Sequence, residues 1–204
     1  MATLLASHQI LASVRDNLSR TSDDPEEIRW VAAARTGDQH SIRLLLQRYR
    51  TRAIRLAAHV LRSDADAEDI AQEAFVRAFR SLRSLKADAG YWPWLARIVV
   101  RLCLDRQRRA FWQRETSADI QPWAGTVVDS SGAELRVLVG QLLDQLSPPM
   151  RAALVLSDLE GMDYSEVASV LGVPIGTVRS RLHTARSQFR ILWLAANREE
   201  AVRE

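Results

Sequence analysis

Arginine and short polar side chains recur at helical spacing near the C-terminal end of the chain. Four side chains recur every three or four residues and so share one face of a helix: Arg179, His183, Arg186 and Arg190. Thr177 and Ser180 lie in the first turn of the same helix. Guanidinium groups and hydroxyls can donate hydrogen bonds to base edges and phosphates, so this face predicts recognition of duplex DNA in the major groove.

The neighbouring residues position this helix. The other side of the helix carries an apolar stripe: Val178, Leu182, Ala185 and Phe189. A preceding short helix is predicted from Asp163, which with Glu166 can cap its start, to Gly172, which can adopt the positive φ of a helix end. Pro174 then redirects the chain into a second short helix. The segment 163–190 therefore predicts a helix-turn-helix; the alternative is an ordinary amphipathic hairpin with a solvated arginine face.

A second basic helix is predicted from about Pro93 to Ala110. One face carries Arg97, Arg101 and Arg108, with Arg106 and Arg109 at the far end. The opposite face carries Leu95, Ile98, Val99 and Leu102. Three aromatic residues precede or begin this helix: Tyr91, Trp92 and Trp94. Aromatic rings beside arginines are typical of sites that hold an unstacked base and grip its phosphates. The alternative is that the rings belong to the core, which we favour for Trp94, whereas both interpretations stay open for Tyr91 and Trp92.

Charge is distributed in blocks along the 204 residues, although the net charge is only +3. Lys86 is the only lysine, so arginine supplies nearly all the positive charge. Six arginines occur between Arg43 and Arg62 without an acidic residue, and five acids then occur between Asp64 and Glu73 without a basic one. This alternation indicates separate anionic and protein partners.

Several classes of function are excluded by composition and spacing. The single cysteine, Cys103, excludes an internal disulfide framework and a multi-cysteine zinc site, and its position favours a buried, inert thiol. We find no phosphate-binding glycine loop and no metal-ligand spacing, so we expect no enzymatic activity, no catalytic residue, no cofactor, no metal and no small-molecule substrate. Neither a bilayer-spanning apolar run nor the apolar core of a secretion signal occurs, which indicates a cytoplasmic protein.

The pattern of caps and breaks predicts an all-α fold. Helices are expected from Pro25 to near Gly37, over 38–62, over 66–84 and over 93–110. Residues 111–133 contain Pro, Gly and Ser without periodicity and predict a linker. A second helical unit follows over 134–194, with a helix boundary at 147–149. Residues 1–24 form an N-terminal extension that is either amphipathic or disordered, and residues 195–204 form a C-terminal tail.

Three segments together resemble the group IV, extracytoplasmic-function (ECF) sigma factors of bacterial RNA polymerase, in the sigma-70 family. They are DAEDIAQEAFVRAFRSL at 66–82, WLARIVVRLCLDRQRR at 94–109, and LSPPMRAALVLSDLEGMDYSEVASVLGVPIGTVRSRLHTAR at 146–186. The resemblance covers roughly residues 28–190. It implies two small helical domains joined by a flexible linker: the sigma region 2 helical bundle over 25–110 and the region 4 helix-turn-helix over 134–194.

The resemblance also implies roles for individual residues. Binding of core polymerase falls to Asp69, Gln72 and Glu73, which would otherwise be read as a solvated helix face. Capture and opening of the minus-ten element fall to Lys86, Tyr91, Trp92, Arg97, Arg101, Arg106, Arg108 and Arg109. Reading of the minus-thirty-five element falls to Thr177, Arg179, Ser180, Arg181, His183 and Arg186. The family often has asparagine where this chain has Arg101, which places promoter preference near the minus-ten element in question.

On this resemblance the chain would bind core RNA polymerase and promoter DNA and direct promoter recognition, melting and transcription initiation. Family members often have an anti-sigma factor as a further partner, which can hold the sigma factor at the membrane. The alternative is a helix-turn-helix regulator whose first domain senses a signal or dimerises and has no sigma activity.

Substitution of two arginines in the second helix separates base reading from phosphate binding. We expect Arg179→Ala to change preference at one position of the upstream element, because Arg179 lies in the first turn of the helix. Arg186→Ala should weaken binding about equally on all sequences, because a phosphate contact carries no sequence information. Competition binding on a panel of single-base variants measures both; equal losses on every sequence for both variants would contradict this division.

Overall fold

The computed structural model describes residues 24–85, 90–114 and 133–200. The expectations for the extension before Asp24, for Lys86, for most of the predicted linker and for residues 201–204 lie outside this described part. Within it, none of the helices is both long enough and apolar enough to cross a membrane.

Residues 24–85 and 90–114 of the first unit form four α-helices. They are α2 (Pro25–Arg35), α3 (Gln39–Leu61), α4 (Asp64–Ser81), which a 3-10 turn extends over Leu82–Ser84, and α5 (Tyr91–Arg114). Asp24 accepts a hydrogen bond from the Glu26 amide at 3.0 Å, and Asp38 accepts one from the Ser41 amide at 2.8 Å. These caps satisfy amides that have no partner within the helix. The expected helices at 25–37 and 38–62 are therefore confirmed.

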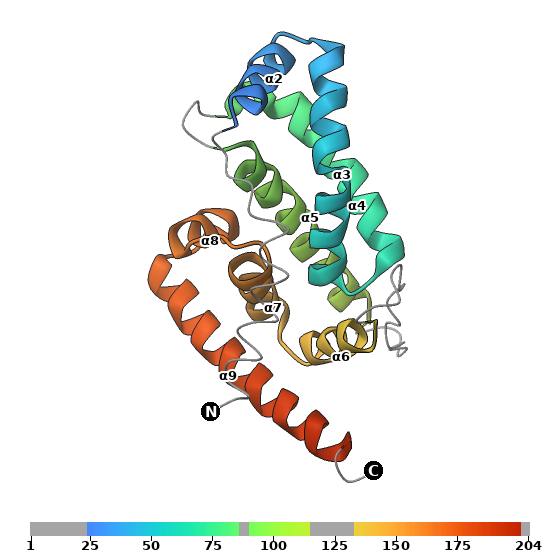
Figure 1. The fold of residues 1–204 in the computed structure, drawn as a ribbon, viewed down its shortest axis with the longest axis vertical. Helices are drawn as coiled ribbons and strands as arrows, with labels where there is room; N and C mark the ends of the chain where they lie inside the picture. Colours follow the sequence, from blue (N-terminus) through green and yellow to red (C-terminus); the bar gives the residue numbers. More distant parts are fainter. Residues whose placement is uncertain (1–23, 86–89, 115–132, 201–204) are drawn as a thin grey trace.

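Helix α3 lies at the centre of the first unit. It packs against α2, α4 and α5 (Figure 1). Leu45, Leu56 and Val60 of α3 are completely buried, and Phe75 of α4 is 4% exposed. The apolar faces of α3, α4 and α5 thus form the core on which the charged faces depend.

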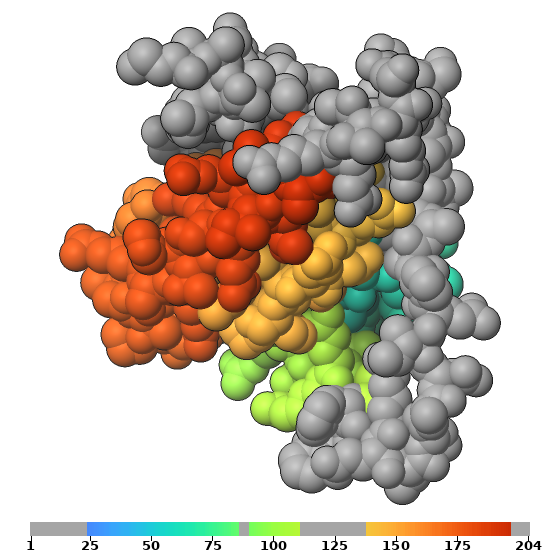
Figure 2. Space-filling view, turned by 90° about the horizontal axis from the view of Figure 1, so that it is seen from below, coloured from blue at the N-terminus to red at the C-terminus, as the bar shows by residue number. Residues whose placement is uncertain are grey.

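The second unit contains α6 (Ala133–Asp144), α7 (Pro148–Leu154), α8 (Tyr164–Leu171) and α9 (Ile175–Glu200). A single π-helical turn, η2 (Val155–Leu159), continues α7. Pro148 stands in the first turn of α7, where it removes no helical hydrogen bond, so the predicted boundary at 147–149 is confirmed. Helix α9 lies beside α6 on the face seen in Figure 2.

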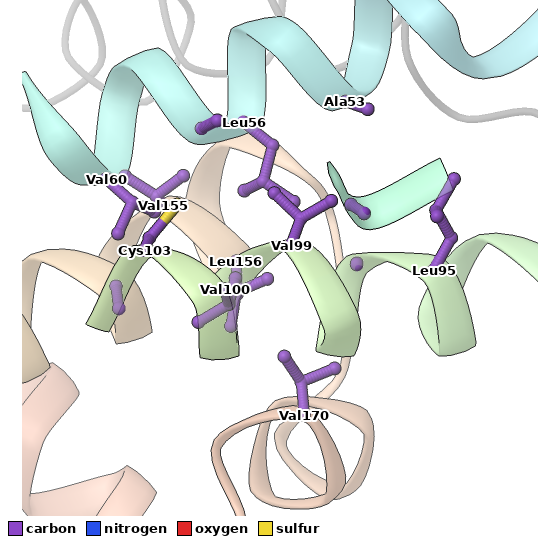
Figure 3. Packing of buried hydrophobic residues seen from close by; sticks show 14 of the residues in the cluster. Ala53, Leu56, Val60, Leu95, Val99, Val100, Cys103, Val155, Leu156 and Val170 are labelled. Carbon is purple, nitrogen blue, oxygen red and sulfur yellow. The ribbon is translucent and has the colours of Figure 1, made fainter. Parts of the chain in front are cut away.

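The two units pack on one another. Figure 3 shows Val155 of η2 close to Val60 of α3 and Cys103 of α5, Leu156 of η2 close to Val100 of α5, and Val170 of α8 facing α5. These side chains belong to one continuous buried cluster. The described parts of the two units therefore share a core.

Three helices differ in length from the expectation. Helix α4 starts at Asp64 rather than Asp66, because Ser63 takes the cap position and accepts from the Asp66 amide at 3.3 Å. Helix α5 starts at Tyr91 rather than Pro93, since a proline is tolerated throughout the first turn, and it continues to Arg114. The prediction of two short helices around Pro174 is wrong for the second: α9 has 26 residues and reaches Glu200, inside the expected tail.

His59, near the C-terminal end of α3, makes the stability of the fold sensitive to acid. Burial, reinforced by the positive charges of Arg62 and Arg55 and opposed by Asp64, lowers the pKa of His59 from 6.5 to about 4. Between these values the unfolded chain binds a proton that the folded chain does not. The free energy of unfolding that depends on His59 is therefore at its highest above pH 6.5, and it falls as the pH decreases toward 4.

We expect this histidine to cost the wild type about 2 kcal/mol of stability between pH 7 and pH 5. The matched variant His59→Gln lacks the titrating group and should lose less over the same interval. Urea unfolding of both proteins at the two pH values measures the difference. Equal losses in the two proteins would show that His59 is protonated equally well in the folded state.

Candidate nucleic-acid interface

The geometry that positions α9 begins at the start of α8. The Asp163 carboxylate accepts from the amides of Ser165 and Glu166 at 2.7 and 2.8 Å, and the Glu166 carboxylate accepts from the Asp163 amide at 2.9 Å. The Ser165 hydroxyl, which donates to the same carboxylate at 2.6 Å, lowers the pKa of Asp163 most, and the amides of Glu166 and Ser165 lower it further. Gly172 ends α8 with φ of 65°, a left-handed conformation that glycine adopts without a Cβ penalty. The predicted cap and turn are confirmed.

Helix α9 presents its polar face to solvent. Val178, Leu182 and Ala185 are buried, at 1% exposure or less, as the stripe predicted. Of the predicted upstream-reading residues, four are exposed: Arg179, Ser180, His183 and Arg186; Thr177 and Arg181 are partly buried. An open groove of about 440 Å³ runs between this face and Tyr164 of α8. Five cationic or polar α9 side chains line it: Arg179, His183, Arg186, Ser187 and Arg190.

Arg186 has a second role that the sequence did not reveal. Its Nε and Nη2 donate to the Asp158 carboxylate at 3.1 and 2.6 Å, and its Nη1 donates to the Tyr164 hydroxyl at 3.1 Å. The hydrogen bonds to Asp158, ahead of those to Tyr164, raise the pKa of Arg186. All three nitrogens are thus engaged within the protein, and Arg186 ties α9 to η2 and α8. Asp158 lies 28 residues away and carries no local signal of this contact.

The basic face of α5 also lies in solvent. Leu95, Val99 and Leu102 are buried on one side, and Ile98 is partly buried. On the other side all five predicted arginines are exposed: Arg97, Arg101, Arg106, Arg108 and Arg109. Two of them make ion pairs, Arg106 with Asp66 of α4 and Arg108 with Asp105 at 2.8 Å. The structure therefore leaves this face available for an anionic partner.

Tyr91 and Trp92 lie inside the protein instead. They are 2% and 5% exposed, and both contact Tyr49 of α3: the Tyr91 ring is tilted against it at 5.2 Å between ring centroids, and the Trp92 ring is stacked on it at 5.7 Å. Trp94 is partly buried, 5.9 Å from Tyr91. The alternative that these rings belong to the core therefore holds for all three residues in this conformation. Here neither Tyr91 nor Trp92 is accessible to a base.

Charged groups surround this aromatic cluster. The Tyr49 hydroxyl donates to Glu27 of α2, and burial, reinforced by this bond, raises the pKa of Tyr49. The Arg52 guanidinium carbon lies 4.1 Å from the centre of the Trp92 ring, and its Nε donates to Glu160 at 2.8 Å. Sequence reasoning missed Glu27 and Glu160, because nothing local marks an acid that will be buried against a distant arginine.

The acidic face of α4 is exposed at all three predicted positions: Asp69, Gln72 and Glu73. Glu73 pairs with Arg77 one turn later on the same helix. Ala67, Ala71 and Ala74 on the opposite side are buried, so helix packing directs the acids outward.

Within the described residues there is no cluster of His, Cys, Asp and Glu able to hold a metal ion. Cys103 is completely buried, and burial raises its pKa to about 12, so the thiol is not a nucleophile at neutral pH.

Two protein-family models match the chain. "Sigma-70 region 2" matches residues 45–113, and "Sigma-70, region 4" matches residues 136–189. The chain is 32% identical over 170 residues to the ECF RNA polymerase sigma-E factor of Escherichia coli (strain K12). This alignment covers 76% of this chain and 88% of that protein. It is 37% identical over 168 residues to the ECF RNA polymerase sigma factor SigE of Mycolicibacterium smegmatis, covering 76% of this chain and 63% of that protein.

Solved structures share the fold. CnrH in complex with the cytosolic domain of CnrY matches with a TM-score of 0.63 at 26% identity, over 83% of this chain and 97% of CnrH. The sigma factor RpoE from Bartonella quintana, in complex with the anti-sigma factor NepR, matches with a TM-score of 0.66 at 21% identity, over 74% of this chain and 95% of RpoE.

The cap of α8 offers a test of how the second unit is held in place. We expect Asp163→Ala to lower the free energy of unfolding by about 1 kcal/mol, because two amides lose their acceptor. Asp163→Ser keeps an acceptor oxygen and should lose less. Urea denaturation of the three proteins measures the effect; equal stability of wild type and Asp163→Ala would show that the cap contributes nothing.

Proposed function

Because this chain belongs to the sigma-70 family, as an ECF RNA polymerase sigma factor, we propose that it binds core RNA polymerase through α4 and promoter DNA through α5 and α9. It thereby directs promoter recognition, melting and transcription initiation. It acts as a binding subunit rather than as an enzyme. Its place of action is the cytoplasm, where polymerase and promoter DNA are found.

One observation carries this proposal most directly. The chain exposes an acidic helix face and two separate arginine faces, and each lies opposite a buried apolar stripe. A helix-turn-helix regulator would need only the arginine face of α9. The exposed acids of α4 and the arginines of α5 have no role in that alternative, and the family assignment favours the sigma factor.

The acidic face of α4 suits a basic partner surface. Asp69 and Gln72 lie exposed beside Glu73, and complementary charge directs the encounter and orientation of two proteins. We assign core-polymerase binding to these three residues.

The two arginine faces suit the two promoter elements. Duplex DNA at the minus-thirty-five element would meet Thr177, Arg179, Ser180, Arg181, His183 and Arg186 of α9. The opened minus-ten element would meet the exposed arginines of α5, with Tyr91 and Trp92 at the start of this helix; Lys86, which lies outside the described residues, is assigned to the same element. Arg101 is fully on the solvent side of α5, so it would add a phosphate contact where the family often has asparagine.

An anti-sigma factor is a further proposed partner. Both solved structures above are complexes: RpoE is bound to the anti-sigma factor NepR, and CnrH is bound to the cytosolic domain of CnrY. The exposed basic faces of this chain would be the surfaces for an inhibitor to cover.

Charge reversal on α4 tests the proposal. Purified wild-type protein with core polymerase should start transcription from a defined promoter without another sigma factor. The double variant Asp69→Lys, Glu73→Lys should reduce core binding at least tenfold, with binding of isolated duplex promoter DNA unchanged.

Glu26→Gln, which removes an exposed carboxylate of α2, is the control. Core affinity can be measured by fluorescence anisotropy and initiation by run-off transcription. Absence of initiation by the wild type would refute sigma activity, and unchanged core affinity of the double variant would remove α4 from the interface.

A further inference from the structure

An acidic residue is joined to the arginine face of α9, the face proposed to meet the upstream duplex. Asp158 lies in the π-helical turn η2, and its carboxylate accepts two hydrogen bonds from Arg186, at 3.1 and 2.6 Å. A carboxylate repels the phosphates of DNA, so an acid bound to this face requires a compensating contribution. Single π-helical turns occur often at functional sites. Asp158 is therefore a candidate for a role in DNA binding.

The hydrogen bonds of Arg186 leave one donor without a partner. A guanidinium carries one hydrogen on Nε and two on each Nη. The Nε hydrogen and one Nη2 hydrogen go to Asp158, and the other Nη2 hydrogen goes to the Ser157 hydroxyl at 3.4 Å. One Nη1 hydrogen goes to the Tyr164 hydroxyl at 3.1 Å. The second Nη1 hydrogen has no acceptor among the described residues.

The Tyr164 hydroxyl is a donor held in a fixed orientation. It accepts the hydrogen bond from Arg186, so its own hydrogen points away from the guanidinium. Among the described residues this hydrogen has no acceptor. The Tyr164 side chain is only partly buried and lines the groove between α8 and α9. Two adjacent donors, one from Tyr164 and one from Arg186, are thus offered to whatever enters this groove.

The groove suits a phosphate of a long polyanion. Neighbouring donors 3.1 Å apart can bind the oxygens of a single phosphate group. Further cationic or polar side chains line the groove on either side of Arg186 along α9, namely Arg179, His183 and Arg190. Because these side chains follow the helix rather than surround one point, they fit the backbone of a nucleic acid better than a free phosphate ion.

We propose that the Tyr164 hydroxyl and the remaining Nη1 hydrogen of Arg186 bind one backbone phosphate of the upstream duplex, and that Asp158 is a positioning residue that holds both donors in place. Asp158 acts through Arg186 and does not touch DNA. A phosphate contact carries no base information, so it fixes the register of α9 and leaves selectivity to residues such as Arg179. This phosphate site rests on the proposed DNA binding by α9.

Tyr164→Phe removes only the hydroxyl. The probe is a short duplex that the full-length wild type selects from random DNA, with binding measured by fluorescence anisotropy. We expect Tyr164→Phe to bind it about tenfold more weakly, because a hydrogen bond to a charged group is lost. The loss should be equal on all single-base variants, with the salt dependence unchanged, since the hydroxyl carries no charge. Ser169→Ala, which removes an exposed hydroxyl from another face of α8, is the matched control and should bind as wild type does.

Asp158→Asn separates positioning from simple charge. Loss of a negative charge near DNA by itself tightens binding, whereas loss of positioning weakens it. We expect Asp158→Asn to weaken binding about threefold in the wild-type background and not at all in the Tyr164→Phe background, where the hydroxyl is already absent. Circular dichroism melting establishes that each variant is folded. Tighter or unchanged binding in the wild-type background, or equal weakening in both backgrounds, would overturn the role of Asp158.

The contacted phosphate can be located by replacing single phosphates of the duplex with uncharged methylphosphonates. One position should weaken binding by the wild type but not by Tyr164→Phe. The absence of any such position, or an unchanged affinity of Tyr164→Phe for the unmodified duplex, would overturn the phosphate site while DNA binding by α9 stands. If the wild type enriches no duplex from random DNA, the proposed DNA binding by α9 fails and the phosphate site fails with it.

Discussion

The apolar side of α5 is the constraint on which the rest of the structure depends. Val99, Val100 and Cys103 are completely buried, with α3 on one side and η2 and α8 on the other. Burying a large apolar side chain contributes about 1.5–3 kcal/mol, so this contact fixes the rotation of the helix. Because side chains on a helix keep their angular relation, the same rotation directs Arg97 and Arg101 to solvent. One packing contact therefore shapes the first core, joins the second unit to it and presents a DNA-binding face.

Charges at the edges of this core decide which arrangement is adopted. Arg52 and Glu160 are both largely buried, and burial raises the pKa of Glu160 although Arg52 opposes the shift. Removing two charges from water offsets much of their attraction, so such a pair contributes more to selecting one packed arrangement than to overall stability. Region 4 is thereby held against the aromatic cluster of region 2. The charged faces of α4, α5 and α9 stay exposed, whereas Tyr91 and Trp92 are buried.

Local signals predicted most of the helices, because each depends on a few neighbouring residues. Asp163 and Gly172 mark the ends of α8 as expected, through bonds to amides and through backbone conformation, and Asp24 and Asp38 cap α2 and α3 close to their expected starts. The π-helical turn at Val155–Leu159 was missed, since it replaces ordinary helical bonding where η2 packs against α3. The length of α9 was missed too: residues 195–204 were expected to form a tail, although no proline or glycine follows Gly176 in the sequence to end the helix.

By itself the sequence determined the all-α class, the helix faces and the family, because periodicity, caps and residue order are properties of short segments. Only the tertiary structure decided which chemical groups are accessible. Tyr91 and Trp92 share their surroundings with Tyr49 and Arg52, and Arg186 is bound by Asp158, through contacts between segments far apart in the chain. Burial and ion pairing depend on what another helix brings to the same place, and spacing along one helix carries no record of that partner.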